Sequence, residues 1–267
     1  MMAFGESIRI KTRREIEAMR VAGRHVAEIL LELRELAKPG VTTGELDEHA
    51  RRSIRKRGVE SSFLGYGPHG LPPYPAVLCV SVNDEVVHGI PGRRELKEGD
   101  VLSLDFGVAW EGYHGDSAVT VPIGALGPEA ERLVEATRRS LEEGIGKMAP
   151  GNRLSDIGHA VQARAEGEGF SVVRQFVGHG IGREMHEPPQ VLHFGKRGTG
   201  LTLREGMVFT IEPMLNQGVR SVLTRDDGWT VVTADSKLSA QFEHTVAVTR
   251  EGVRVLTLRP DEVARAL

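Results

Sequence analysis

The sequence has only one cysteine, Cys79, among its 267 residues. A single cysteine excludes an internal disulfide bond and a zinc site built from several thiolates. The sequence also lacks an apolar run of about 18 residues, which is the length that a membrane-spanning helix requires. Residues 1–20 lack the apolar core of a signal peptide. We therefore expect a cytoplasmic protein that does not enter a membrane.

An excess of positive charge is absent as well. The 34 Lys and Arg residues are balanced by 37 Asp and Glu residues, and the formal net charge is -3. Basic side chains cluster at residues 51–57 within a predicted helix, where a charge run usually forms a solvated face. The composition therefore gives no signal for nucleic-acid binding. The length is compatible with one large domain or two small ones.

Residues 101–121 carry the pattern of a β-hairpin with two aspartates. In the first strand, bulky apolar residues alternate with small or polar ones, which is the period of a strand with two different faces. A two-residue turn at Glu111-Gly112 would place Asp105 opposite Ala118. Asp116 would then be a diagonal neighbour of Asp105 on the same face. The bulky positions of the first strand are Leu102, Leu104, Phe106, Val108 and Trp110.

These two carboxylates need a partner of opposite charge. Two anions about 7–8 Å apart on a hydrophobic strand pair repel each other and lose hydration unless a cation lies between them. One interpretation is a pair of divalent metal ions, because carboxylates combined with imidazole suit first-row metals. The alternative is that each aspartate meets an arginine. The hairpin alone does not decide between the two.

Two helices are predicted at the beginning of the chain. Apolar residues at helical spacing predict a long helix that begins at Lys11 or Thr12. A second helix is capped by Thr43 and closed by Gly58. Together they account for the chain before the first glycine-rich and proline-rich segment.

That segment, residues 61–75, contains too many Gly and Pro residues for regular structure. A loop of this length suggests a function. A strand near residues 76–82 is predicted to follow it. His88 then lies in a second, shorter loop.

The second half of the sequence repeats the plan of the first. The matching segments are 39–58 with 150–169, and 95–107 with 202–214. The alignment sets Asp105 against Glu212. The repeated parts, roughly 10–123 and 127–250, predict a single catalytic domain of residues 1–267. Its two similar halves would pack about a pseudo-twofold axis with the active site between them.

Further potential ligands lie in three other segments. They are His179 and His186 in VGHGIGREMHEPP, Glu212 in FTIEPM, and Glu243 in SAQFEHTVAV. An isolated acid in an apolar strand is more often a salt-bridge partner than a metal ligand. Four such acids favour a metal site here, together with a histidine between glycines that allow close approach. His159 and His193 are interpreted as surface or packing histidines.

Short motifs in a fixed order add a wider resemblance. They are VVHGIP at His88, LDFG, HGDSA, GHGIG, MHEPPQV, TIEPM, DGWT and SAQFEHT. With these motifs the sequence resembles the type I methionine aminopeptidases in their short bacterial form. That family has the pita-bread fold, which it shares with prolidases and creatinases. The resemblance implies an α/β (α+β) fold with two pseudo-twofold-related halves and a curved antiparallel sheet covered by helices.

The resemblance also implies two divalent metal ions, of cobalt, manganese, iron, zinc or nickel, that activate a water molecule. Asp116 and Glu243 would bridge the two ions, and Glu212 would transfer protons. The implied metal ligands are Asp105, Asp116, His179, Glu212 and Glu243. The implied catalytic residues are His88, His186 and Glu212. The implied substrate-binding residues are His88, His186, Cys79, Tyr66, Tyr74, Met185 and Trp229.

The implied substrates are nascent polypeptides that begin with methionine followed by a small residue. A transient contact with the ribosome and a monomeric state are expected with them. Two features depart from the family pattern: the loop at residues 61–75 is longer, and Met185 replaces a common aromatic residue. Two alternatives are an Xaa-Pro peptidase of the same fold and a non-catalytic pita-bread binding protein. The lack of a large additional N-terminal domain favours the methionine enzyme.

Overall fold

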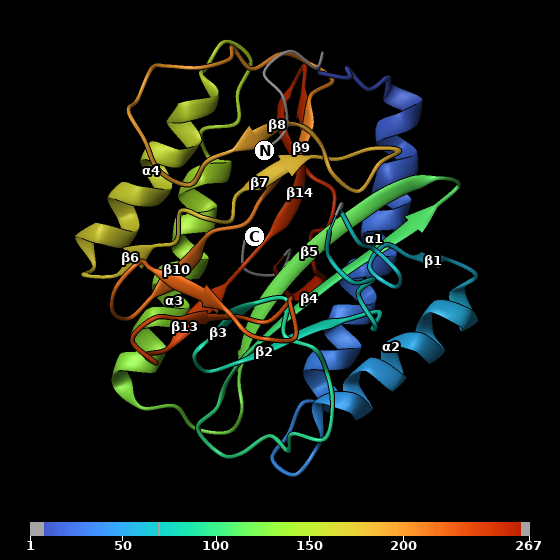
Figure 1. Ribbon diagram of the computed structural model, residues 1–267. Coiled ribbons are helices and arrows are strands. Elements are labelled where there is room, and N and C mark those ends of the chain that lie inside the picture. The colour runs from blue at the N-terminus through green and yellow to red at the C-terminus, as the bar shows by residue number, and fades with distance from the viewer. Residues whose placement is uncertain (1–7, 69, 263–267) are drawn as a thin grey trace.

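Four helices flank the strands of the computed structural model, which describes residues 8–68 and 70–262. They are α1 (Arg13–Leu36), α2 (Thr43–Arg57), α3 (Pro128–Ile145) and α4 (Leu154–Gly167). Helices α1 and α2 lie on one side of the strands and α3 and α4 on the other (Figure 1). Residues 1–7, which belong to the N-terminal segment predicted to lack a signal peptide, lie outside the described residues.

Helices α1 and α2 both begin at a threonine cap. Thr12 accepts the N–H of Glu15 at 3.3 Å, and the Glu15 carboxylate accepts the N–H of Thr12 at 2.7 Å. This capping box confirms the predicted start of α1. The predicted cap of α2, Thr43, is wrong, because Thr43 is already helical. Thr42 is the cap, since its backbone is extended and its side chain accepts the N–H of Glu45 at 3.2 Å.

Two further boundaries surround the long loop. Helix α2 ends at Gly58, whose φ of 63° is left-handed and favours glycine, as predicted. The strand predicted at residues 76–82 is shorter, because β2 comprises Cys79–Val82. Two backbone N–H groups just before β2 donate to the Asp47 carboxylate of α2, at 2.8 and 3.2 Å. These bonds replace strand pairing there.

The strands pair antiparallel throughout the described residues. They are β1 (Glu60–Ser61), β2 (Cys79–Val82), β3 (Glu85–Val87), β4 (Val101–Trp110), β5 (Tyr113–Pro122), β6 (Ser171–Val172), β7 (Gly178–Gly180), β8 (Glu187–Val191), β9 (Val208–Ile211), β10 (Met214–Asn216), β11 (Val222–Thr224), β12 (Val231–Thr233), β13 (Ser239–Gln241), β14 (His244–Thr249) and β15 (Gly252–Val255). Their ladders are ordered β1-β4-β2 with β5 beside β4, β13-β10-β6, β11-β12-β3 and β15-β14-β9-β7-β8. Mixed helices and antiparallel strands confirm the predicted α+β class.

The β4/β5 hairpin has the predicted register. Asp105 pairs with Ala118 and Gly107 pairs with Asp116, so the two aspartates are diagonal neighbours on one face. Both residues of the Glu111-Gly112 turn have positive φ angles, 49° and 72°, as a type I′ turn requires. The bulky residues of the other face pack into a core shared with α1, where all are buried except the partly buried Trp110. One face of the hairpin therefore builds the core and leaves the other for the aspartates.

The two halves of the chain make matching contacts at positions that correspond in the repeat. An isolated bridge joins Thr42 to Glu95, and another joins Arg153 to Thr202. The first bridge connects the start of α2 to the segment before β4, and the second connects the start of α4 to the segment before β9. Strand β4 carries Asp105, and Glu212 directly follows β9.

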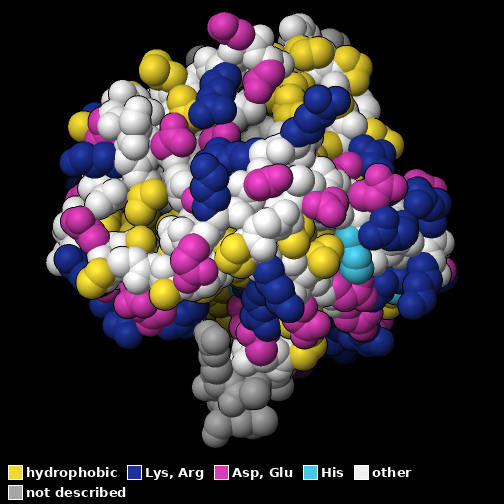
Figure 2. Space-filling model, turned by 90° about the horizontal axis from the view of Figure 1, so that it is seen from below, with side chains coloured by type: hydrophobic (Ala, Val, Ile, Leu, Met, Phe, Trp, Pro, Cys, Tyr) yellow, Lys and Arg dark blue, Asp and Glu magenta, His cyan; other side chains and the backbone are white. Residues whose placement is uncertain are grey.

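Charged side chains of both signs are mixed on one face of the molecule. On the face shown in Figure 2, Lys and Arg side chains are interspersed with Asp and Glu side chains, without a large area of one sign. That face offers little attraction to a polyanion. None of the described helices is both long and apolar enough to cross a membrane.

Candidate active site

All of the predicted site residues line one cavity of about 450 Å³. They come from both halves of the chain, with the hairpin β4/β5 on one side and the segments around β7, β9 and β14 on the other. The residues are Tyr66, Tyr74, Cys79, His88, Asp105, Asp116, His179, Met185, His186, Glu212, Trp229 and Glu243. Sequence segments from both repeated parts of the chain therefore meet in one cavity.

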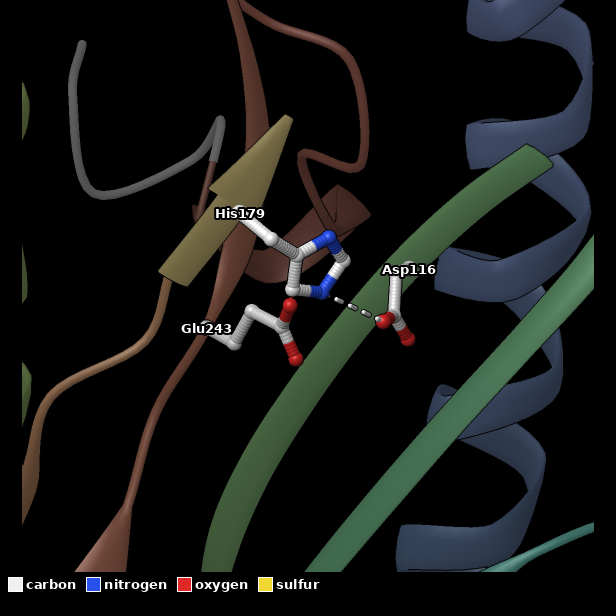
Figure 3. Close-up of side chains that lie close together, drawn as sticks. All are labelled: Asp116, His179 and Glu243. Carbon is white, nitrogen blue, oxygen red and sulfur yellow. Dashed lines mark ion pairs between the residues drawn. The ribbon is translucent and has the colours of Figure 1, made fainter. Parts of the chain in front are cut away.

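Three of these side chains form a compact group (Figure 3). Asp116 comes from β5, His179 from β7, and Glu243 from the link between β13 and β14. One ligand atom of each lies within 4.8 Å of the others. His179 Nε2 lies 3.9 Å from Asp116 Oδ2 and 3.6 Å from Glu212 Oε1. The group can hold a cation, and Glu212 adjoins it.

One carboxylate oxygen on each of three acids of the cavity has no hydrogen-bond partner among the described residues. Asp105 Oδ1, Asp116 Oδ1 and Glu243 Oε1 are buried and accept no hydrogen bond within the described residues. Among those residues, neither aspartate forms an ion pair with an arginine or lysine, so the alternative of two Asp–Arg pairs is wrong. A buried carboxylate without a partner is costly. Oxygen and imidazole donors in this arrangement suit a divalent metal ion.

Burial dominates the titration of the acids. It raises the pKa of Asp105 to about 7 and that of Glu212 to about 8. It also raises the pKa of Asp116 and of Glu243 well above the usual range, and the neighbouring carboxylates add to the effect. The cause is desolvation followed by repulsion between like charges. Without a cation between them, the charged forms of these four acids are therefore disfavoured.

His179 has the opposite shift and a defined orientation. Burial lowers the pKa of His179 to about 4, so its ring is neutral at pH 7. Its Nδ1 donates to the Gly180 carbonyl at 2.9 Å. This bond fixes the tautomer and directs the lone pair of Nε2 toward the acids. His179 thus has the protonation state of a metal ligand.

Thr210 connects two of the candidate ligands. Its hydroxyl accepts the N–H of His179 at 3.0 Å and donates to Glu212 Oε1 at 2.6 Å. A single buried side chain on β9 therefore positions both His179 on β7 and the carboxylate of Glu212. The sequence contains no signal for this role, because a threonine in a β-strand is ordinary.

His193 also positions Glu212. The sequence predicts a surface or packing histidine here, and the side chain is buried. Its Nε2 accepts the backbone N–H of Glu212 at 3.0 Å. Glu212 lies just beyond the last paired residue of β9, where the backbone N–H needs a partner from outside the ladder. Glu212 is therefore held at its backbone by His193 and at its side chain by Thr210.

The turn that carries Met185 and His186 is fixed by an ion pair. Glu187 Oε1 accepts the N–H of Arg183 at 3.0 Å, and its Oε2 accepts from Lys11 Nζ at 2.8 Å. Both members of this pair are buried. The segment before α1 thereby holds the turn against the site.

The His186 ring lies over the ring of His179, with centroids 4.1 Å apart, and 5.0 Å from the ring of Tyr66. Burial lowers the pKa of His186 to about 3. His88 lies edge to face with Phe176 at 5.4 Å and with Trp229 at 6.0 Å. Burial lowers the pKa of His88 to about 4. Both rings are therefore neutral at pH 7. A neutral imidazole can donate one hydrogen bond to a polar substrate and accept another.

His88 has a strained backbone. Its φ of 59° is left-handed, which is uncommon outside glycine and is retained where the surrounding structure requires it. The next residue is Gly89, where a Cβ atom would lie 2.2 Å from the carbonyl oxygen of Val80. The backbone after His88 passes so close to β2 that only glycine fits there. In this conformation the His88 ring lines the cavity.

Aromatic residues with fixed orientations form the apolar wall of the cavity. Tyr74 donates to the Gly89 carbonyl at 2.9 Å, and Trp229 Nε1 donates to the Pro72 carbonyl at 2.9 Å. The rings of Tyr74 and Trp229 pack edge to face at 5.2 Å. Cys79 completes this wall as a buried thiol whose pKa is raised by burial. The long loop at residues 61–75 thus contributes a wall of the cavity.

Sequence reasoning missed other lining residues. Phe63 and Phe176 also border the cavity. Apolar residues in irregular segments have no periodicity that could assign them to a pocket. Their position depends on how the loops fold back over the strands.

Comparisons with known proteins agree with this geometry. The sequence model of metallopeptidase family M24 matches residues 17–250. Methionine aminopeptidase B of Synechocystis sp. is 51% identical over 246 residues, which are 92% of this chain and 90% of that protein. A crystal structure of methionine aminopeptidase from Thermotoga maritima superposes with a TM-score of 0.91 at 44% identity, covering 94% of this chain and 99% of that one.

A more distant structure has the same fold. The prolidase from Pyrococcus horikoshii superposes with a TM-score of 0.75 at 20% identity, and the match covers 94% of this chain and 63% of that one. This likeness concerns the fold alone. The predicted pita-bread fold is confirmed by the closer matches. The chain belongs to metallopeptidase family M24 and, within it, to the methionine aminopeptidases.

Proposed function

We propose that this protein is an aminopeptidase that removes the N-terminal methionine from nascent proteins and peptides, with a preference for a small second residue. The observation that carries this proposal is the group of four acids and a neutral histidine that line one largely apolar cavity. Relatives that are named methionine aminopeptidases over nearly the whole chain support it.

Two divalent metal ions fit the donor set. Asp105 and Asp116 would hold one ion and His179 and Glu212 the other, while Asp116 and Glu243 would serve both. The carboxylate oxygens that lack hydrogen bonds support this assignment. When bound, the ions supply positive charge that stabilises the transition state and an activated water as nucleophile. Cobalt, manganese, iron, zinc and nickel are all compatible with these ligands.

The remaining chemistry belongs to the side chains. Glu212 takes a proton from the attacking water and returns it to the leaving amine, a service worth about 10²–10⁴-fold. The neutral His186 donates a hydrogen bond to the oxygen on which negative charge develops. His88 hydrogen-bonds the substrate amide.

The proposal extends to the working state of the protein. Residues 1–267 would act as one catalytic domain, with the site between the repeated parts. The protein would work as a monomer in the cytoplasm, with nascent chains as partners and a transient contact with the ribosome.

The function is tested by metal titration of the apo-protein while cleavage of a Met-Ala-Ser peptide is followed by chromatography. We expect no cleavage without metal and cleavage that rises with added Mn²⁺ or Co²⁺. Cleavage of Ala-Pro peptides without a requirement for methionine would instead indicate an Xaa-Pro peptidase. Tight metal binding without any cleavage would indicate a non-catalytic binding protein.

Metal binding should weaken on acidification. In the metal-free protein the pKa of Asp105 is about 7 and that of Glu212 about 8, so a bound ion must displace protons from these acids. The dissociation constant should rise roughly tenfold per pH unit for each displaced proton below these values. His179 does not compete in this range, because its pKa is about 4. Calorimetry in two buffers of different ionisation enthalpy counts the released protons, and an affinity independent of pH from 8 to 6 would contradict this assignment.

The Thr210 hydroxyl should matter for metal retention. Thr210→Val keeps the shape of the side chain but removes the bonds to His179 and Glu212. Loss of such outer partners costs about 10–100-fold in metal affinity or activity. Thr210→Ser keeps the hydroxyl and serves as the matched control. Equal metal affinity of both variants would show that the hydroxyl does not position the ligands.

A further inference from the structure

Arg259 is a fully buried arginine behind the site. It lies after β15 and has 2% of its surface exposed. Its Nη2 donates to Glu262 Oε1 at 2.5 Å, and its backbone N–H donates to Glu262 Oε2 at 2.8 Å. Its Nη1 donates to Ser117 Oγ at 3.1 Å. A buried guanidinium with these bonds orders the segment around it.

The contact with Ser117 leads directly to the candidate metal ligands. Ser117 follows Asp116 on β5, and its hydroxyl donates to the backbone carbonyl of Glu243 at 2.5 Å. One chain of hydrogen bonds therefore runs from Arg259 through Ser117 to Glu243. It links the backbones that carry the two acids proposed to serve both ions.

The same segment also holds the residue after Glu243. His244 Nδ1 lies 2.9 Å from Thr257 Oγ1, and His244 Nε2 lies 3.3 Å from Glu262 Oε1. Both ring nitrogens of His244 thus face groups of residues 256–262. The residues that follow each of the two acids are bound by this one segment.

Helix α1 keeps the segment in place. A Cβ atom at Gly23 would lie 2.3 Å from the carbonyl oxygen of Leu256, so the segment and the helix are in direct backbone contact. Gly115 on β5 fits against the same part of α1, since a Cβ there would lie 2.8 Å from the nitrogen of Gly23. The segment, the helix and the strand that carries Asp116 form one packed unit.

We propose that residues 256–262 are a brace that sets the separation of Asp116 and Glu243, with Arg259 and Glu262 as its positioning residues. Neither residue touches the cavity. The brace acts through Ser117 and His244 and determines how tightly the site retains metal. This inference rests on the proposed metal site.

Arg259→Met tests the brace, with metal affinity of the apo-protein measured by calorimetry. We expect the dissociation constant of at least one ion to rise by about 10–100-fold, as for other outer partners of metal ligands. At saturating metal, the kcat should fall less than the affinity does. Arg34→Met is the matched control, because Arg34 forms a half-buried pair with Asp261 of the same segment at 2.7 Å and has no hydrogen bond to Ser117. That control should bind metal as the wild type does.

Removal of one buried charge leaves the other without a partner and can prevent folding. Circular dichroism of the apo-protein checks this, and Ser117→Ala breaks the same chain of bonds without removing a charge. Tenfold weaker metal binding by folded Arg259→Met or by Ser117→Ala supports the brace. Wild-type affinity in the folded variant, or in Ser117→Ala if Arg259→Met does not fold, overturns it. Failure of the wild type itself to bind metal would instead refute the proposed function.

Discussion

Replacement of Asp116 by asparagine or of Glu243 by glutamine is expected to abolish peptide cleavage. In the proposed site each of these carboxylates serves both ions, and an amide offers no second anionic oxygen. The structure adds a second reason. Asp116 Oδ1 and Glu243 Oε1 have no hydrogen-bond partner within the described residues, so nothing else in the site would replace the lost ligand.

The measurement is turnover of Met-Ala-Ser together with the metal content of the purified variants. We expect turnover no higher than the blank and less than the wild-type amount of bound metal. His159→Ala is the control, because His159 lies on α4 outside the cavity and should leave both values unchanged. Near-wild-type turnover of either acid variant at stoichiometric metal would show that the assignment of two bridged ions is wrong.

The same substitutions should raise the free energy of unfolding of the metal-free protein. The pKa of Asp116 and that of Glu243 are raised because burial and neighbouring carboxylates disfavour their charged forms. A buried charge without a partner opposes folding. The acids of the metal-free site therefore lower the stability of the protein, as functional sites commonly do.

The parts of this fold that follow from local pattern were predictable. The period of two in residues 101–121 and the Glu111-Gly112 turn together predict the register that pairs Asp105 with Ala118. The same register makes the two aspartates neighbours. From there, the motifs that carry His179, Glu212 and Glu243 were sufficient to predict which acids and which histidine line the same cavity.

The exact start of a helix and the contacts between distant segments were not predictable. The choice of Thr42 over Thr43 as a cap depends on one residue of backbone geometry, and sequence alone rarely defines boundaries so closely. The roles of Thr210 and His193 arise only because β7, β9 and the segment after β8 meet. Arg259 was missed for the same reason, since its partner Ser117 is more than a hundred residues away.

Substrate choice should separate this protein from Xaa-Pro peptidases of the same fold most clearly. An unbranched thioether side chain fits an apolar cavity, and the walls at Tyr74 and Trp229 are fixed by hydrogen bonds that limit adjustment. One methylene of misfit costs about 1–3 kcal/mol, or 10- to 200-fold in kcat/KM. Norleucine at the first position should therefore be accepted. Valine should be disfavoured by about 10- to 200-fold, and lysine by more, because its charge would enter an apolar site.

The test is a series of peptides that vary in the first two positions, with kcat/KM measured for each. At the second position we expect Gly, Ala and Ser to be accepted and Leu, Met and Arg to be rejected. Trp229→Ala should enlarge the pocket and raise the relative rate of a Phe-Ala peptide, because the ring closes one wall and packs against Tyr74. If Val-Ala is cleaved as fast as Met-Ala by the wild type, the cavity is not a methionine pocket. If Trp229→Ala leaves the order of first residues unchanged, the methionine side chain binds elsewhere in the cavity, because removal of a wall that it touches must change which side chains fit.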